Sequence, residues 1–200
     1  SKPFNNVTFT ELMEKHFKNI DYQITGMAVL FAKTGNNTIT SMAESYIFAL
    51  IIITLMMIIL IGRIKIGLLS MIPNLTPIIL SLGVIGAFNF PMDMFTVMVA
   101  SIAIGLAVDD TIHFMHNFRR YYERTGDPQR AVFETLHTTG RAMLVTTIVL
   151  SFGFFIYMFA TLQNISRFGF LTGFTIITAL AADYLVAPAL MVIVNKKRSK

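Results

Sequence analysis

The chain has 200 residues, of which 54% are hydrophobic and only 14% carry a charge. A soluble domain is typically about 25% charged, so this composition excludes an ordinary soluble protein and indicates a membrane protein. The net charge is +5, but the basic residues lie at the ends of apolar runs, which argues against nucleic acid as a partner. Cysteine is absent, which excludes disulfides and thiolate metal sites.

Residues 1–43 are the only part with a soluble composition, and we expect them to complete an extracytoplasmic α+β domain. A capping-box pattern predicts a short helix over Phe9–Ile20. The segment Tyr22–Ala32 is rich in β-forming apolar residues and predicts a buried strand, followed by a loop at Lys33–Thr40. One helix and one strand cannot bury a core alone, so we expect the chain to be a piece of a longer protein.

Five apolar runs of membrane length follow, which predicts an all-α transmembrane domain over residues 44–195 and a basic cytoplasmic tail at 196–200. The expected helices span about 44–62, 66–88, 93–120, 141–162 and 167–194. A second capping box, Ser41-x-x-Glu44, is expected to begin the first of them.

Two further elements are predicted from prolines. Pro73 and Pro77 predict a kink near the start of the second span, because each removes a backbone hydrogen bond. Asp127 as N-cap and Pro128 at the first helical position predict a helix between the third and fourth spans. This helix, 127–139, is amphipathic and is expected to lie on the membrane surface.

The basic residues indicate an orientation. Of the 16 Lys and Arg residues, 11 fall on one side of the predicted spans and 5 on the other. The larger set is Arg63, Lys65, Arg119, Arg120, Arg124, Arg130, Arg141, Lys196, Lys197, Arg198 and Lys200. The excess of positive charge places that side in the cytoplasm. The N-terminal segment is then extracytoplasmic and the C-terminus cytoplasmic, as an odd number of spans requires.

The most unusual feature is the acid pair Asp109-Asp110, which follows an unbroken apolar run from Met94 to Val108. An acidic side chain in the middle of a membrane costs about 2.5–3.5 kcal/mol on insertion scales, so such residues are rare and usually functional. Two neighbouring carboxyl groups at this depth can bind a proton and release it when the environment changes. A structural ion pair or hydrogen-bonded contact between helices is the alternative.

Other polar groups lie at a similar predicted depth. A rise of about 1.5 Å per residue places Thr146, Thr147 and Asp183 near the level of the acid pair, so we expect one buried polar cluster. The threonines would bond either the aspartates or their own helix, and Asp183 either carries protons or bonds a neighbouring helix. His113 and then His116 continue the face of the acid pair toward the cytoplasm. They form either a proton ladder or contacts with lipid headgroups.

A metal site made of the two aspartates with His113 and His116 is disfavoured, because adjacent side chains on a helix point about 100° apart. No nucleophile–base pair with an orienting third group and no nucleotide-binding loop is visible. We therefore expect neither a metal nor a cofactor, and no enzymatic activity.

The pattern Gly105-x-x-Val108-Asp109-Asp110, with Ile112-His113 and Asn117-Phe118-Arg119-Arg120 after it, resembles the resistance–nodulation–division (RND) transporter superfamily. The resemblance is strongest to its lipid-exporter-like branch of MMPL, hopanoid-exporter and Patched-like proteins, and it covers residues 41–195. Further motifs that carry it are Ile72-Pro73-Asn74-Leu75-x-Pro77, Pro91-Met92-Asp93, Thr138-Thr139-Gly140-Arg141, Ala182-Asp183 and Pro188-Ala189-Leu190.

The resemblance implies two six-helix repeats, each with a large extracytoplasmic domain, and this chain looks like the last five helices of the C-terminal repeat. It implies export of hydrophobic or lipid-like substrates from the cell inner membrane, driven by the proton-motive force, with Asp109 and Asp110 carrying protons. The implied partners are membrane lipids, the substrate, the N-terminal repeat of the same protein and, in some arrangements, further copies of it. A non-transporting, sterol-sensing-like lipid-binding domain is the alternative.

Overall fold

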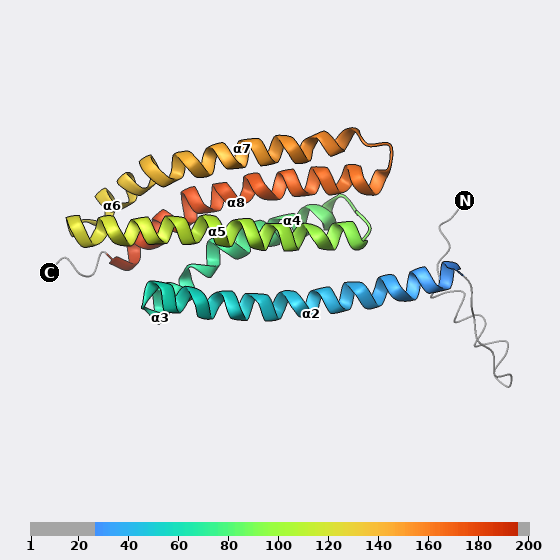
Figure 1. Cartoon of the computed structure of the whole chain (residues 1–200), viewed down its shortest axis with the longest axis horizontal. Helices are drawn as coiled ribbons and strands as arrows, with labels where there is room; N and C mark the ends of the chain where they lie inside the picture. The colour runs from blue at the N-terminus through green and yellow to red at the C-terminus, as the bar shows by residue number, and fades with distance from the viewer. Residues whose placement is uncertain (1–26, 196–200) are drawn as a thin grey trace.

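The computed structural model describes residues 27–195, with side chains from residue 37 onward, and this part of the chain is helical throughout apart from short turns (Figure 1). The elements are α2 (Met27–Ile61), α3 (Ile64–Leu69), α4 (Met71–Ala87), α5 (Met94–Thr125), α6 (Pro128–Thr135), a π-helical turn (Leu136–Gly140), α7 (Arg141–Phe155), a 3₁₀ turn (Ile156–Phe159) and α8 (Gln163–Asn195). Five stretches of the described residues are long and apolar enough to cross a membrane. The all-α membrane fold with five spans is therefore confirmed.

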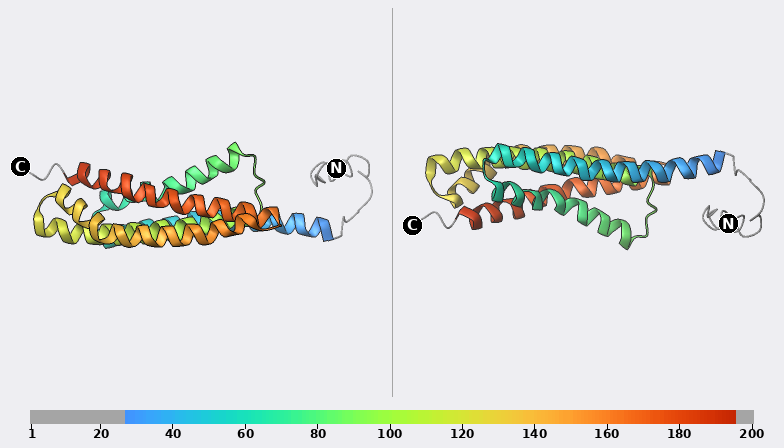
Figure 2. Two further views of the ribbon diagram at one scale, coloured as in Figure 1. Left: turned by 90° about the horizontal axis from the view of Figure 1, so that it is seen from above. Right: turned by 90° about the horizontal axis from the view of Figure 1, so that it is seen from below.

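Helices α5 and α8 pack against each other at the centre of the bundle (Figures 1 and 2). Helices α4 and α7 pack against α8, while α2 packs against α5 at the edge. Successive spans run in opposite directions, so the α4–α5 and α7–α8 connections lie at one end of the bundle. The α2–α3 and α5–α6 turns and the end of α8 lie at the other (Figure 1).

The ends of α5 are set by local chemistry. The Asp93 side chain accepts hydrogen bonds of 2.8 Å from the backbone N–H and the hydroxyl of Thr96, which caps the helix. Gly126 ends α5 with φ +68°, a conformation that glycine adopts without strain. Asp127 then caps α6 with Pro128 in its first turn, as predicted. These caps hold the length and register of the helix that carries the acid pair.

The second span is interrupted at Ser70, between α3 and α4. Pro73 and Pro77 lie in the first two turns of α4 and cannot donate the backbone hydrogen bonds of a continuous helix. The Ser70 hydroxyl donates 2.7 Å to the carbonyl of Gly67 and satisfies one of the groups left at the break. The interruption lies where the two prolines predict a kink.

The strand and loop predicted before the first span are wrong for the residues that the structure describes. Residues 27–32 of the predicted strand, the predicted loop at Lys33–Thr40 and the predicted helix start at Ser41 all lie inside α2. A continuous helix satisfies its own backbone groups, whereas a strand needs a partner. The β preference of a few residues is too weak to oppose this. The predicted helix Phe9–Ile20, most of the expected α+β domain and the tail 196–200 lie outside the described residues.

The helix predicted at 127–139 begins at Pro128 as expected, but it is not separate from the fourth span. Its position on the membrane surface stays a prediction. Helix α6 continues through the π-helical turn into α7 without a break, so that Pro128–Phe159 forms one helical stretch. Gly140 allows this junction to approach α8, because a Cβ at that position would lie 2.7 Å from the Tyr184 hydroxyl. π-Helical turns are rare, and those that occur inside α-helices are frequently found at functional sites.

Candidate functional site

The acid pair of α5 is divided between two faces of the helix. Asp109 lies on the outer face with 70% of its side chain exposed, and its Oδ1 is 3.5 Å from Nε2 of His113, which is 62% exposed. Asp110 is half-buried and close enough to Asp183 and Tyr184 of α8 to interact with them electrostatically. The division follows from the turn of about 100° between successive residues of a helix.

Inside the bundle, three helices meet at a chain of polar side chains. Asp183 of α8 is 1% exposed, Thr111 of α5 is 0% exposed and Asn74 of α4 is 1% exposed. The Thr111 hydroxyl oxygen lies 2.8 Å from Asp183 Oδ1 and 2.7 Å from Asn74 Oδ1. Asp183 Oδ2 is buried without a hydrogen-bond partner. We call Asp183, Thr111 and Asn74 the buried polar chain.

A second polar contact joins α4 and α8 farther along the bundle. The hydroxyls of Ser81 and Thr175 are both buried and bond each other, and Thr175 donates 2.6 Å to the carbonyl of Leu171. Ser81 therefore donates to Thr175, so that each of the two hydroxyl protons has a hydrogen-bond acceptor. This contact adds polar adhesion between the two helices but holds no ionisable group.

The two threonines of α7 do not join the acids. Thr146 is exposed and donates to the carbonyls of Met143 and Ala142, at 2.9 and 3.2 Å, within its own helix. Thr147 is buried, but within the described residues it forms no hydrogen bond with an aspartate. The predicted depth does not bring these residues to the acid pair, because α7 packs mainly on α8. The single cluster expected from depth is therefore divided: Asp109 is exposed, Asp110 is half-buried, Asp183 is buried, and the threonines of α7 are not hydrogen-bonded to any of them.

Two members of the buried polar chain, Thr111 and Asn74, were missed by the sequence reasoning. Thr111 directly follows the acid pair, and Asn74 lies between Pro73 and Pro77 in an otherwise apolar run. An amide side chain at membrane depth usually bonds another helix, so Asn74 by itself predicts a hydrogen bond between helices. The sequence does not indicate which helix is the partner.

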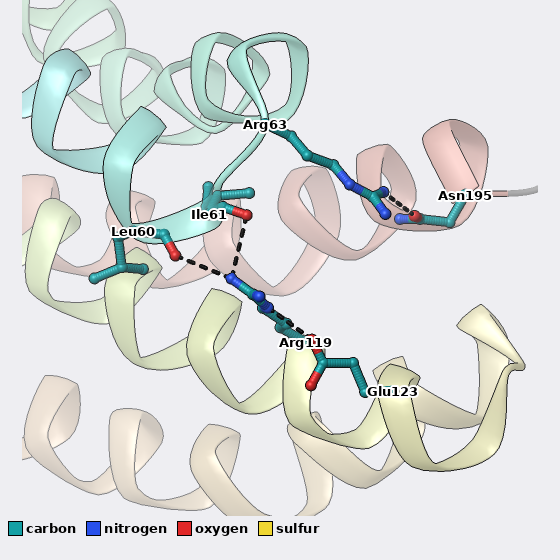
Figure 3. Close-up of polar contacts among 6 residues, drawn as sticks. All are labelled: Leu60, Ile61, Arg63, Arg119, Glu123 and Asn195. Carbon is teal, nitrogen blue, oxygen red and sulfur yellow. Dashed lines mark hydrogen bonds and ion pairs between the residues drawn. The ribbon is translucent and has the colours of Figure 1, made fainter.

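The end of the bundle that holds the α2–α3 and α5–α6 turns carries basic side chains around a cavity of about 730 Å³. His116, one turn beyond His113, is among the residues that line it. Figure 3 shows Arg119 of α5 reaching the end of α2, where its Nη1 donates to the carbonyls of Leu60 and Ile61 at 3.4 Å. Its Nε also donates 2.8 Å to Glu123 on the same helix.

Arg119 is expected to make a small contribution to stability, because it places a cation at the carboxyl end of α2. A positive charge at a helix C-terminus contributes about 0.3–1 kcal/mol when exposed, and exposed ion pairs such as Arg119–Glu123 contribute little. Arg119→Gln should lower the free energy of unfolding by that amount. Arg130→Gln is the matched control, because Arg130 is exposed near the start of α6, where a cation has no favourable helix end. Equal changes in the free energy of unfolding in Arg119→Gln and Arg130→Gln would contradict the capping role of Arg119.

Within the described residues, no three His, Asp or Glu side chains lie close enough together to hold a metal ion. The arrangement can instead bind protons, because it places two carboxyl groups, Asp110 and Asp183, near each other inside a helical membrane bundle and a third, Asp109, on its surface.

Comparison with known proteins supports the membrane fold. The model of the MMPL family matches residues 10–200. A protein of Methanocaldococcus jannaschii described as a membrane protein is 28% identical over 127 residues, which cover 64% of this chain and 33% of that protein. The chain thus aligns with about a third of that relative's length. A family match over nearly the whole chain shows that it is a multi-pass membrane protein of the MMPL family, within the RND superfamily.

Proposed function

We propose that this chain is part of an exporter of hydrophobic or lipid-like substrates that is driven by the proton-motive force and acts as a transporter, not as an enzyme. The acid pair Asp109-Asp110 is its proton relay. The substrate class and the direction of transport rest on membership of the MMPL family, and the relay rests on the geometry of α5.

One observation carries the relay: the two acids connect the surface of the bundle with its interior. Asp109 is 70% exposed and Asp110 is half-buried beside Asp183. The two acids are consecutive residues, so a proton that reaches Asp109 from outside the bundle has a second, less exposed carboxyl group one residue away. A charge that moves through the membrane potential releases about 2.3 kcal/mol per 100 mV, which is the energy such a relay would use.

A route to one end of the bundle runs along the same face of α5. His113 pairs with Asp109 at 3.5 Å, and His116 lies one turn farther on and lines the cavity of about 730 Å³ at the basic end. An imidazole ring has two nitrogens and can take up a proton at one and release a proton at the other. Protons would leave the acid pair through these histidines into the cavity.

The exposed face of Asp109 and His113 needs a cover in the membrane. Charged side chains in transmembrane segments almost always face a bundle interior or a water-filled cavity, yet this pair lies on the surface of the chain. We propose that the N-terminal repeat of the same protein covers this face, and further copies of the protein are a second source of cover. The alignment with only 33% of the relative leaves room for such a repeat.

The distribution of charge supports an orientation. Around the basic end lie Arg63, Lys65, Arg119, Arg120, Arg124 and Arg130, whereas Arg167 is the basic residue of 37–195 at the opposite end. The positive-inside rule then places the basic end and the C-terminus in the cytoplasm and the N-terminal segment outside the cell inner membrane.

The test is proton flux through the full-length protein in liposomes that contain a pH-sensitive dye. Asp109→Asn and Asp110→Asn should each reduce the flux driven by an imposed pH gradient to the level of protein-free liposomes. Asp93→Asn is the matched control, because it makes the same change on the same helix and asparagine still caps a helix start. Undiminished flux in both variants would refute the relay. Bound lipid without flux in the parent protein would favour the sterol-sensing-like alternative.

A further inference from the structure

The buried polar chain contains more hydrogen bonds than its one hydroxyl can donate. Thr111 Oγ1 lies 2.7 Å from Asn74 Oδ1 and 2.8 Å from Asp183 Oδ1, and both distances are those of good hydrogen bonds. A threonine hydroxyl has one proton, whereas an amide oxygen and an ionised carboxylate only accept. One of the two contacts therefore needs a proton from the other partner.

Two arrangements supply that proton and keep the Thr111 proton within the chain of side chains. In the first, Asp183 is protonated and donates to Thr111, which donates to Asn74 Oδ1. In the second, Asp183 is ionised and the amide of Asn74 is reversed, so that its nitrogen donates to Thr111 and Thr111 donates to Asp183.

The surroundings favour the first arrangement. With the amide as it stands, Asn74 Nδ2 donates to Met71 Sδ at 3.9 Å, a weak bond that the reversed amide would lose. The second arrangement also leaves an ionised Asp183 with a single hydrogen bond, because its Oδ2 has no partner. An ion taken out of water carries an effective penalty of several kcal/mol unless it is paired.

No nearby cation offsets that penalty. Within residues 37–195, no Lys, Arg or His forms an ion pair with Asp183. Of the helices that pack on α8, α5 contributes Asp110, a group of like charge. α4 contributes the uncharged Asn74, and within residues 37–195 no charged group of α6 or α7 forms an ion pair with Asp183.

We propose that Asp183, Thr111 and Asn74 form a buried proton-binding site, separate from the exposed acid Asp109, in which a proton on Asp183 joins α8 to α5 and α4. Loss of this proton reverses the hydrogen bonds of the whole chain, because Thr111 must turn its hydroxyl to Asp183 and Asn74 must turn its amide. Proton binding here would thus change the contact between three helices. The use of that change in transport rests on the proposed function; the presence of the proton does not.

Infrared spectroscopy of the full-length protein in lipid membranes tests the site, because a protonated carboxyl group has a C=O stretching band that a carboxylate lacks. We expect such a band to be present at neutral pH, to be lost in Asp183→Asn and to be retained in Asp109→Asn. Thr111→Val should shift the band, because it removes the hydroxyl oxygen to which the protonated Asp183 donates. Thr111→Ser keeps that hydroxyl and should leave the band in place.

Isotope labelling provides a measurement without substitution. In the parent protein made with aspartate that carries ¹³C at the side-chain carboxyl carbon, the band should move, which assigns it to an aspartate. Because Asp110 can also hold a proton, the band of Asp183 is identified in the difference between the spectra of the parent protein and of folded Asp183→Asn. A difference spectrum without a protonated aspartate band at neutral pH would overturn the proposal. The outcome is distinct from that of the flux assay. A band without proton flux contradicts only the proposed function, and flux without the band contradicts only the buried proton site.

Discussion

Replacing Thr111 by valine is expected to destabilise the protein by about 2 kcal/mol, although the two side chains have the same shape. The substitution removes the hydroxyl that joins Asn74 to Asp183 and leaves an oxygen of each buried without a partner. Because both neighbours are at most 1% exposed, neither gains a hydrogen bond to solvent in exchange.

The magnitude follows from two opposing considerations. An orphaned buried polar group costs about 1–3 kcal/mol in proteins generally. Hydrogen bonds between transmembrane helices average only about 0.6 kcal/mol and reach about 1.7, because separated helices find other partners in the membrane. Thr111 makes two such contacts, with α4 and α8, so its loss should lie near the upper end of the membrane range or above it.

The measurement is the free energy of unfolding in mixed detergent micelles, with Thr76→Val as the matched control. Thr76 lies on α4, and its hydroxyl donates 2.8 Å to the carbonyl of Ile72 in the same helix. A bond within one helix gives no adhesion between helices, so its loss should change stability by far less. Similar losses in the two variants would show that the buried polar chain does not hold the helices together.

The five spans were predictable because membrane length and apolarity are local properties of the sequence. The caps at Asp127 and Pro128 were predictable for the same reason. The start of α2 was not, because the strand and loop preferences of residues 22–40 are local, whereas the presence of a partner strand is not a local property of the sequence. The described part of that segment is helical.

The sequence predicts how deep the site residues lie along the membrane spans, but not which face of its helix each residue occupies. The rise of a helix places Asp109, Asp110 and Asp183 near one level, yet the face that each presents depends on which helix lies beside it. That choice is made by packing between residues far apart in sequence, such as Asn74 and Thr111. For this reason the single expected cluster is divided into the exposed Asp109 and His113 and the buried polar chain. Thr111 could not be predicted as a member, because a threonine in a membrane helix usually bonds its own helix.

Gly169→Ala is expected to lower the free energy of unfolding by about 1–3 kcal/mol, the usual range for an overpacked contact. A Cβ at position 169 would lie 2.6 Å from the carbonyl oxygen of Phe154 and 2.6 Å from Cβ of Tyr157. Neither atom is the far end of a flexible side chain, so α7 and α8 must move apart. Small residues that allow close approach of backbones are typical of helix contacts in membranes.

The control for this prediction separates packing from helix propensity. Gly153→Ala introduces the same methyl group on α7 at a position where, apart from the backbone of its own helix, no atom of the described residues lies within 4 Å. Alanine is favoured over glycine within a helix by about 1 kcal/mol, so Gly153→Ala should leave stability unchanged or raise it. A lower free energy of unfolding in Gly169→Ala together with an unchanged or higher one in Gly153→Ala would attribute the loss of stability to the contact between α7 and α8. Loss of stability in both would instead implicate the backbone freedom of glycine and would remove the evidence that α7 and α8 depend on this close approach.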